Sequence, residues 1–145
     1  MKQNDVILQS VTKVAVVIIL TFSIYLFLNG HHYPGGGFIG GLSTASAIIL
    51  LYLAFDIEEV SKNIPIDFKK LAAFGVLIAL ITGVFGLLSN QPFLTQSIGN
   101  MNIPLFGEIE ITSALFFDTG VAFAVIGTAV TIILSISEDD SLWKR

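Results

Sequence analysis

Residues 14–28 read VAVVIILTFSIYLFL, and this stretch without a charged side chain decides the fold. A bilayer core about 30 Å thick is crossed by about 20 helical residues. The stretch reaches that length when it is extended to Val11 and the Lys13 side chain reaches back to the interface. Three further apolar runs have similar lengths. The sequence therefore predicts four transmembrane helices, at about residues 11–29, 35–55, 71–89 and 112–136.

The composition favours a membrane protein over a soluble one. Hydrophobic residues make up 54% of the 145, and the mean hydropathy is +0.84. Charged residues account for 12%, against about 25% in soluble domains. A soluble chain of this size could not bury so much apolar surface, and helices of a soluble core would keep polar faces. We therefore expect an all-α integral membrane protein with one membrane domain over residues 1–145 and no cleavable signal peptide.

The basic residues predict the orientation of the helices in the membrane. All of them lie before or early in the first apolar run, between the second and third runs, or after the fourth: Lys2, Lys13, Lys62, Lys69, Lys70, Lys144 and Arg145. The connections on the other side contain none. Because basic residues are retained on the cytoplasmic side, both termini and the middle connection are expected in the cytoplasm.

Several functional classes are disfavoured. The net charge of −4 and the absence of a basic cluster argue against nucleic-acid binding. There is no cysteine, and no nucleophile–base arrangement or cofactor motif, so neither an enzyme nor a bound cofactor is expected. His31 and His32 are adjacent but have no third ligand, so no metal site is expected.

Asp118 is the one acidic residue inside an apolar run. An ionisable group at membrane depth is costly and commonly lies along an ion path or at a protein contact. No Lys or Arg accompanies it in the apolar core of any predicted helix, so a partner subunit, a histidine, water or protonation is expected to neutralise it. A purely structural role, with Asp118 hydrogen-bonded at a helix contact, remains the alternative.

The outward connections supply further candidates for an ion path. Glu108 and Glu110 lie before the fourth helix with no basic residue near them, where acidic side chains can concentrate cations. Their alternation with Phe106, Ile109 and Ile111 is equally typical of a short extended segment in a solvated loop. His31 lies on the same side and can titrate near neutral pH.

The stretch GHHYPGGGFIGG over residues 30–41 is the most distinctive motif. Pro34 suits the first position of a helix, and Gly36/Gly40 and Gly37/Gly41 are two G-x-x-x-G pairs that allow helix backbones to approach closely. Small residues recur every four positions in the third and fourth runs as well: Gly75, Ala79 and Gly83, and Gly120, Ala124 and Thr128. The predicted packing residues of the main motif and the last run are Pro34, Gly35, Gly36, Gly37, Phe38, Gly40, Gly41 and Gly120.

These residues carry a family resemblance. The pattern G-H-x-x-P-G-G-G-F-x-G-G at residues 30–41, joined to F-D-x-G-V at residues 117–121, resembles the MnhB/MrpB subunit of the Mrp-type multisubunit cation/proton antiporters of bacteria. The resemblance implies a multi-pass companion subunit of a bacterial cell-membrane complex that exchanges Na⁺ for H⁺ and supports sodium extrusion and alkaline pH homeostasis. Its implied partners are the other Mrp subunits, the larger of which carry the main proton-pumping machinery.

Three functional hypotheses follow. The chain is a companion subunit that lines part of an ion route through Asp118, or a purely structural assembly subunit with no residue in that route. The third hypothesis is a self-sufficient homo-oligomeric transporter. It is the weakest, because coupled ion exchange is not expected from a chain with one acidic residue, Asp118, inside its apolar runs.

Overall fold

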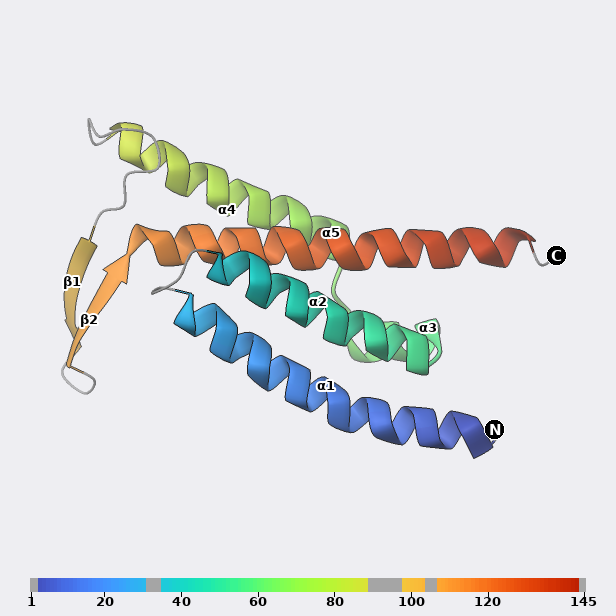
Figure 1. Ribbon diagram of the computed structural model, residues 1–145. Coiled ribbons are helices and arrows are strands. Elements are labelled where there is room, and N and C mark those ends of the chain that lie inside the picture. Colours follow the sequence, from blue (N-terminus) through green and yellow to red (C-terminus); the bar gives the residue numbers. More distant parts are fainter. Residues whose placement is uncertain (1–2, 31–34, 89–97, 104–106, 144–145) are drawn as a thin grey trace.

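The computed structural model describes residues 3–30, 35–88, 98–103 and 107–143, with side chains over residues 6–30, 35–84 and 114–137. Its elements in chain order are α1 (Gln3–Asn29), α2 (Gly36–Ala54), α3 (Ile57–Asn63), α4 (Phe68–Leu88), β1 (Ile98–Ile103), β2 (Gly107–Thr112) and α5 (Ser113–Trp143). The four long helices form a row in the order α1, α2, α5, α4 (Figure 1). Their direction alternates along the chain, so the neighbours α2 and α5 run parallel, while α1 and α4 run the opposite way. Both chain ends and α3 lie near one end of the helix axes, which we call the α3 end of the row, and the β1–β2 ribbon lies near the other end of the axes (Figure 1).

Each of the four apolar runs forms a helix. Within the described part of the chain, three helical stretches are long and apolar enough to cross a membrane: Val6–Asn29, Gly36–Ala54 and Ala114–Ser137. The fourth long helix, α4, has 21 residues, and its charged residues, Lys69 and Lys70, both lie in its first turn. The number of spans and the cytoplasmic position of the termini stay predictions.

The helices continue into polar sequence at the two chain ends. α1 begins at Gln3, before the predicted start, and α5 continues to Trp143 through the charged tail. The charged connection after α2 contains α3, whose buried Val60 anchors it to the core. Hydropathy marks where a helix enters lipid, but it does not mark where backbone hydrogen bonding stops.

The antiparallel β1–β2 ribbon is a departure from the all-α prediction. Its register pairs Ile98 with Thr112 and Ile103 with Gly107. The alternation around Glu108 and Glu110, which is typical of extended structure, falls within β2. The first strand has a weaker pattern in the sequence, IGNMNI, and the sequence does not single it out.

The core lies at the α3 end of the row. It is formed by buried residues of α2, α3, α4 and α5: Ala45, Tyr52, Val60, Phe68 and Val130. The Tyr52 and Phe68 rings meet edge to face, with centroids 6.4 Å apart. Elsewhere large apolar side chains face outward, as with Val14 and Val17 of α1, which are 62% and 64% exposed. Such a surface suits contact with lipid or with other membrane helices.

A cation–π contact connects α1 to the end of α2. The Lys13 ammonium lies 5.6 Å from the centre of the Phe55 ring. Phe55 ends α2 in an extended conformation, and its backbone N–H donates to the Leu51 carbonyl oxygen. The contact holds Lys13 toward the end of the row that carries α3.

Candidate functional site

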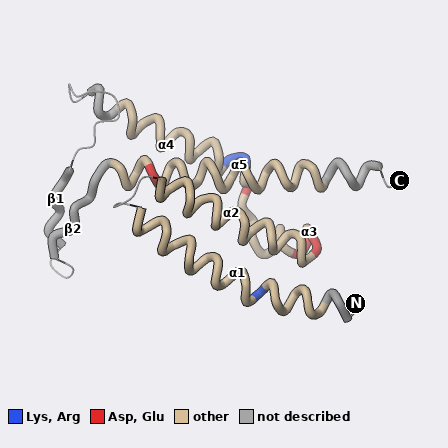
Figure 2. The backbone as a smooth tube through the Cα atoms, in the orientation of Figure 1, with Lys and Arg blue, Asp and Glu red and all other residues tan. Residues whose placement is uncertain are grey.

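Asp118 lies in the second turn of α5, the helix that directly follows the β ribbon. Its side chain is partly buried, and it is not without an interaction partner in the folded chain. No other residue between 114 and 137 is charged. The remaining charged positions coloured in Figure 2 lie toward the opposite end of the row, near α3, the start of α4 and the first half of α1. Asp118 is thus separated from the charged end by several turns of apolar helix.

α2 packs on the main chain of Asp118 through glycine. A Cβ atom added at Gly37 would lie 2.8 Å from the Asp118 Cα atom. One turn further along α2, a Cβ atom at Gly41 would lie 2.9 Å from the Ala122 Cα atom. No side chain fits at either glycine, so the Gly37/Gly41 pair lets the two helix backbones touch.

The second glycine pair faces the other neighbour of α2. A Cβ atom at Gly40 would lie 2.9 Å from the Phe27 Cβ atom and 3.2 Å from the Ser23 carbonyl oxygen, both on α1. Gly36 lies against Gly30, directly after α1. The two G-x-x-x-G pairs are offset by one residue, about 100° around a helix, and they therefore contact different helices.

α4 packs against the opposite side of α5. A Cβ atom at Gly120 would lie 2.7 Å from the Ala79 nitrogen and 2.8 Å from the Gly75 carbonyl oxygen. Nearer the α3 end, a Cβ atom at Gly127 would lie 2.8 Å from the Ala72 Cα atom. The turn that carries Asp118 is therefore held between α2 and α4, and its main chain has little room to move.

α2 begins at Gly36, one residue after the predicted boundary at residue 35. Pro34, the predicted first helical position, lies outside the described residues. Gly35 precedes the helix with φ 97°, a left-handed conformation that glycine adopts without steric cost. The Phe38 side chain is 53% exposed and lies on the lipid- or partner-facing surface of α2.

The other candidates for the ion path are placed only in part. Glu108 pairs with Asn102 and Glu110 with Asn100 in the β ribbon, so both glutamates occupy the same face of β2. The side chains of β2 are not described, and His31 and His32 lie outside the described residues. Among the side chains that are described, no three His, Cys, Asp or Glu residues come together as a metal site.

A second polar group of residues lies at the α3 end and is not singled out by the sequence. It includes Tyr52 of α2, Lys69 of α4 and Thr131 of α5, which line one pocket. Thr131 and Ser135 stand out as hydroxyl residues near the end of the fourth apolar run, but the sequence does not relate them to Tyr52 or Lys69.

The comparison with protein families shows which family the chain belongs to. Residues 7–131 match the family described as a domain related to the MnhB subunit of Na⁺/H⁺ antiporter. The chain belongs to the MnhB family. The match includes both the glycine stretch of α2 and Asp118. This family is one of antiporter subunits and not a family of known enzymes.

Individual MnhB relatives are similar over nearly their whole length. The B-type Na⁺/H⁺ antiporter subunit of Alkalihalophilus pseudofirmus is 56% identical over 140 residues, which cover 97% of each chain. A Staphylococcus epidermidis chain that carries the name antiporter subunit mnhB2 is 50% identical over 94% of this chain and 97% of its own.

A solved structure has the same fold. The structure of the Mrp complex from Dietzia sp. DQ12-45-1b contains a chain that matches with a TM-score of 0.73 and 29% identity. The match covers 89% of this chain, which corresponds to 14% of the length of the solved chain. Together with the long apolar helices, these relationships make the MnhB-family chain a multi-pass protein of the cell membrane.

Proposed function

We propose that the chain is the B-type companion subunit of a multisubunit Na⁺/H⁺ antiporter complex. The observation that carries the proposal is the 56% identity to the B-type Na⁺/H⁺ antiporter subunit of Alkalihalophilus pseudofirmus over 97% of both chains. In this function the chain supports sodium extrusion and alkaline pH homeostasis, and its partners are the other Mrp subunits. Na⁺ and H⁺ are the ions that the complex exchanges.

The shape of the chain supports a companion function. A single row of four long helices encloses little interior, and the outermost helices expose large apolar side chains. On α4 these include Phe74, Leu77 and Leu80, which are 55%, 52% and 57% exposed. An enclosed ion path through a membrane needs protein or water on all sides of its polar groups. A row of this kind supplies one wall of such a path and leaves the others to partner subunits.

The proposed topology has four spans, with both termini and α3 in the cytoplasm. Positive charge supports it. Lys62 lies in α3, and Lys69 and Lys70 lie in the first turn of α4, at the α3 end of the row. Lys13 contacts Phe55, which follows α2 at the same end. Asp118 and the β ribbon then lie toward the outer surface. Successive long helices along the chain run in opposite directions, which is compatible with four crossings.

The proposed ion-path residues are Asp118, with His31, Glu108 and Glu110 on the outer side. The alternative is that Asp118 stabilises only the contact between α2 and α5, in which case the chain is an assembly subunit. A further alternative is a homo-oligomer that transports ions without other subunits. These alternatives predict different results when the chain is present alone and when Asp118 is changed.

Complementation tests the proposed function. The gene is introduced into bacteria whose own antiporter complex lacks only its MnhB-type subunit, and Na⁺-dependent proton movement is measured in everted membrane vesicles. Restored antiport and restored growth in sodium at alkaline pH are expected. The control expresses the chain in cells that lack the whole complex, where no antiport is expected. Activity in those control vesicles would support the homo-oligomeric transporter, and an assembled complex without activity would contradict the companion function.

A further inference from the structure

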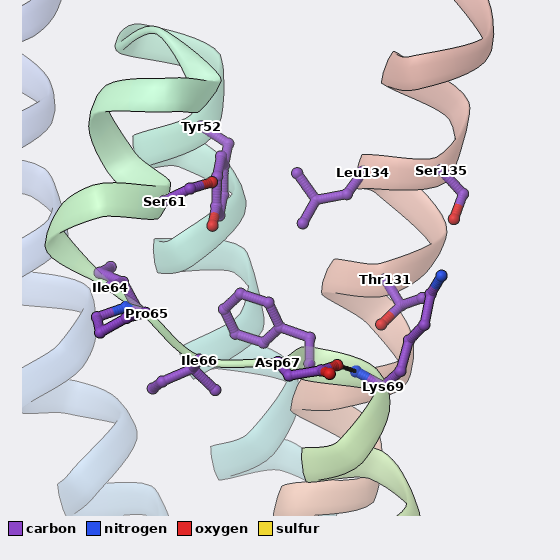
Figure 3. A pocket seen from close by; sticks show the side chains of 11 residues that line it. Tyr52, Ser61, Ile64, Pro65, Ile66, Asp67, Lys69, Thr131, Leu134 and Ser135 are labelled. Carbon is purple, nitrogen blue, oxygen red and sulfur yellow. Dashed lines mark hydrogen bonds between the residues drawn. The ribbon is translucent and has the colours of Figure 1, made fainter.

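The α3 end of the row contains a pocket of about 450 Å³ that the antiporter function leaves unexplained. It lies between the end of α2, the α3–α4 connection, the first turn of α4 and α5 (Figure 3). Its polar lining consists of Tyr52, Ser61, Asp67, Lys69, Thr131 and Ser135. Apolar side chains of the same elements, such as Ile66 and Leu134, form the rest of its wall. The lining is thus divided between hydrogen-bonding groups and hydrocarbon.

Among the described residues, Thr131 is distinguished by a buried hydroxyl that has no hydrogen-bond partner. Hydroxyls within the long helices commonly donate to the carbonyl oxygen four residues earlier, as Thr119 donates to Leu115 over 2.7 Å and Thr82 to Ile78 over 2.8 Å. Within the described residues, the Thr131 Oγ1 atom is buried and has no hydrogen-bond partner. A buried hydroxyl without a partner is unfavourable by about 1–3 kcal/mol. Thr131 also lines the pocket, so a ligand bound there is one source of the missing hydrogen bond.

The charges around the pocket favour an anion. Lys70 forms an ion pair with Asp67, with 3.2 Å between Nζ and Oδ2. The Asp67 Oδ1 atom also accepts the backbone N–H groups of Lys69 and Lys70. The carboxylate is therefore already occupied. Among the described residues no carboxylate lies within ion-pair distance of the Lys69 ammonium, and in Figure 3 the Lys69 side chain extends toward α5, where Thr131 and Ser135 lie.

The position of the pocket relative to the membrane identifies the anion. α2 ends at Ala54 and α4 begins at Phe68, so the pocket lies where the apolar helices give way to the charged α3 segment. In the proposed four-span topology this is the level of the lipid head groups. Basic pockets between membrane helices at this level bind the phosphates of anionic lipids. Ile66, which is 50% exposed, continues the apolar wall toward the surface where acyl chains lie.

We propose that this pocket binds the phosphate group of an anionic glycerophospholipid. The Lys69 ammonium pairs with the phosphate, and the hydroxyls of Thr131, Ser135 and Ser61 hydrogen-bond its oxygens. The apolar wall contacts the glycerol and the beginning of the acyl chains. The bound lipid joins α2, α4 and α5 at the end of the row where the core cluster lies. This inference concerns lipid binding, and it stands or falls independently of antiport.

Titration with phosphatidylglycerol tests the proposal. The purified full chain in a neutral detergent is mixed with phosphatidylglycerol, and bound lipid is counted by native mass spectrometry. Lys69→Gln and Thr131→Val are each expected to weaken phosphatidylglycerol binding about fivefold, because each removes one contact to the phosphate. Lys69 is exposed, so its substitution leaves the fold intact.

Two neighbouring positions supply matched controls. Lys62→Gln removes the same charge but from an exposed residue of α3 that does not line the pocket, and Thr128→Val removes an exposed hydroxyl one turn away on α5. Both variants are expected to bind phosphatidylglycerol nearly as the unchanged chain does. Equal weakening by Lys69→Gln and Lys62→Gln would overturn the proposal, since it would show a diffuse surface charge effect. Displacement of the lipid by equimolar inorganic phosphate would show that the pocket binds free phosphate as well as it binds the lipid, and would overturn the proposal of a lipid site. The absence of any phosphatidylglycerol bound to the purified chain would also overturn it.

Discussion

Gly37 on α2 lies directly against the main chain of Asp118 on α5, and a Cβ atom at Gly37 would come within 2.8 Å of the Asp118 Cα atom. The two residues belong to the two stretches that carry the family resemblance, and 81 positions of sequence separate them (118 − 37). Their contact brings the glycine stretch and the acidic motif together in the folded chain. Because these glycines have no side chains, the α2 backbone packs directly against the turn of α5 that contains Asp118.

Gly37→Leu is expected to lower the amount of folded and assembled protein. The new side chain meets main-chain atoms of α5, which cannot rotate away as a side chain can. The overpacking is therefore expected to destabilise the folded chain by about 1–3 kcal/mol or more. The measurement is the amount of chain in the purified complex. Ser46→Leu, at an exposed position of the same helix, is the control and is expected to assemble normally.

Gly40→Leu provides an independent test of the second glycine pair, because its contact is with α1. It is expected to lower assembly in the same way, since a Cβ atom there would lie 2.9 Å from the Phe27 Cβ atom. If either glycine variant assembled fully and changed only ion affinity, the packing interpretation of the motif would be wrong.

The four-span topology predicts opposite labelling of two single cysteines. The chain contains no cysteine of its own, so Ser61→Cys and Ser97→Cys each introduce a unique thiol. A membrane-impermeant maleimide applied to intact cells is expected to label the Ser97→Cys variant and to label the Ser61→Cys variant only after the membrane is opened. Labelling of both variants from outside would exclude four spans with cytoplasmic termini.

Asp67 is expected to stabilise the start of α4 in a pH-dependent manner. The hydrogen bond from the Lys70 backbone N–H and the contact with the Lys70 side chain lower the pKa of Asp67 below its ordinary value of 3.8. Because the folded state binds the proton more weakly, the contribution is present at neutral pH and is lost as the pH falls below about 3.8. Asp67→Asn keeps an oxygen acceptor but loses the charge, so it lowers the melting temperature at pH 7.

Thermal unfolding of the purified chain at pH 7 and pH 3 measures this contribution. The difference between the unchanged chain and Asp67→Asn is expected to shrink at the lower pH. Asp56→Asn is the matched control, because Asp56 precedes α3 but makes no side-chain capping hydrogen bond. A difference that grows on acidification would contradict the assigned direction of the pKa shift.

The helices are readable from the sequence, whereas their neighbours are not. Apolar runs with almost no charged residues predict α1, α2, α4 and α5, because lipid requires internally hydrogen-bonded helices. The offset glycine pairs indicate close packing of α2 on more than one side. Nothing in the local sequence states that α5, rather than α4, lies beside α2, because that choice depends on contacts between residues far apart in the chain. Gly37 and Asp118 become neighbours only in the folded row.

The polar segments are the less predictable part. α3 and the β ribbon form in stretches where hydropathy is low and where local hydrogen bonding decides the conformation. Val60 was not distinguishable as a core residue within a highly charged connection. The pocket around Thr131 was equally hidden, since its lining comes from four elements and its most informative feature is an unsatisfied hydroxyl oxygen.

The last prediction concerns the ionisation of Asp118. Its turn is fixed by Gly37 on one side and by Gly75 and Ala79 of α4 on the other, through close contact with main-chain atoms of residues 118–120. The position of the main chain at Asp118 therefore does not depend on the charge of the side chain. Asn has nearly the same shape as Asp and keeps hydrogen-bonding ability, but it cannot release a proton. A purely structural role thus tolerates Asn, and a role in an ion route does not.

Asp118→Asn is therefore expected to leave the complex assembled while antiport falls or its pH profile moves. Asp118→Glu keeps an ionisable carboxyl group and is expected to retain part of the activity, although the longer side chain places the carboxyl group differently. Antiport is measured in everted vesicles across a range of pH, and the amount of assembled complex is measured in the same membranes. Thr119→Val, at the neighbouring position whose hydroxyl donates to the Leu115 carbonyl oxygen, is a control for a general disturbance of this turn. Full antiport with an unchanged pH profile in the assembled Asp118→Asn complex would remove Asp118 from the ion route. It would leave the residue as a structural contact between α2 and α5.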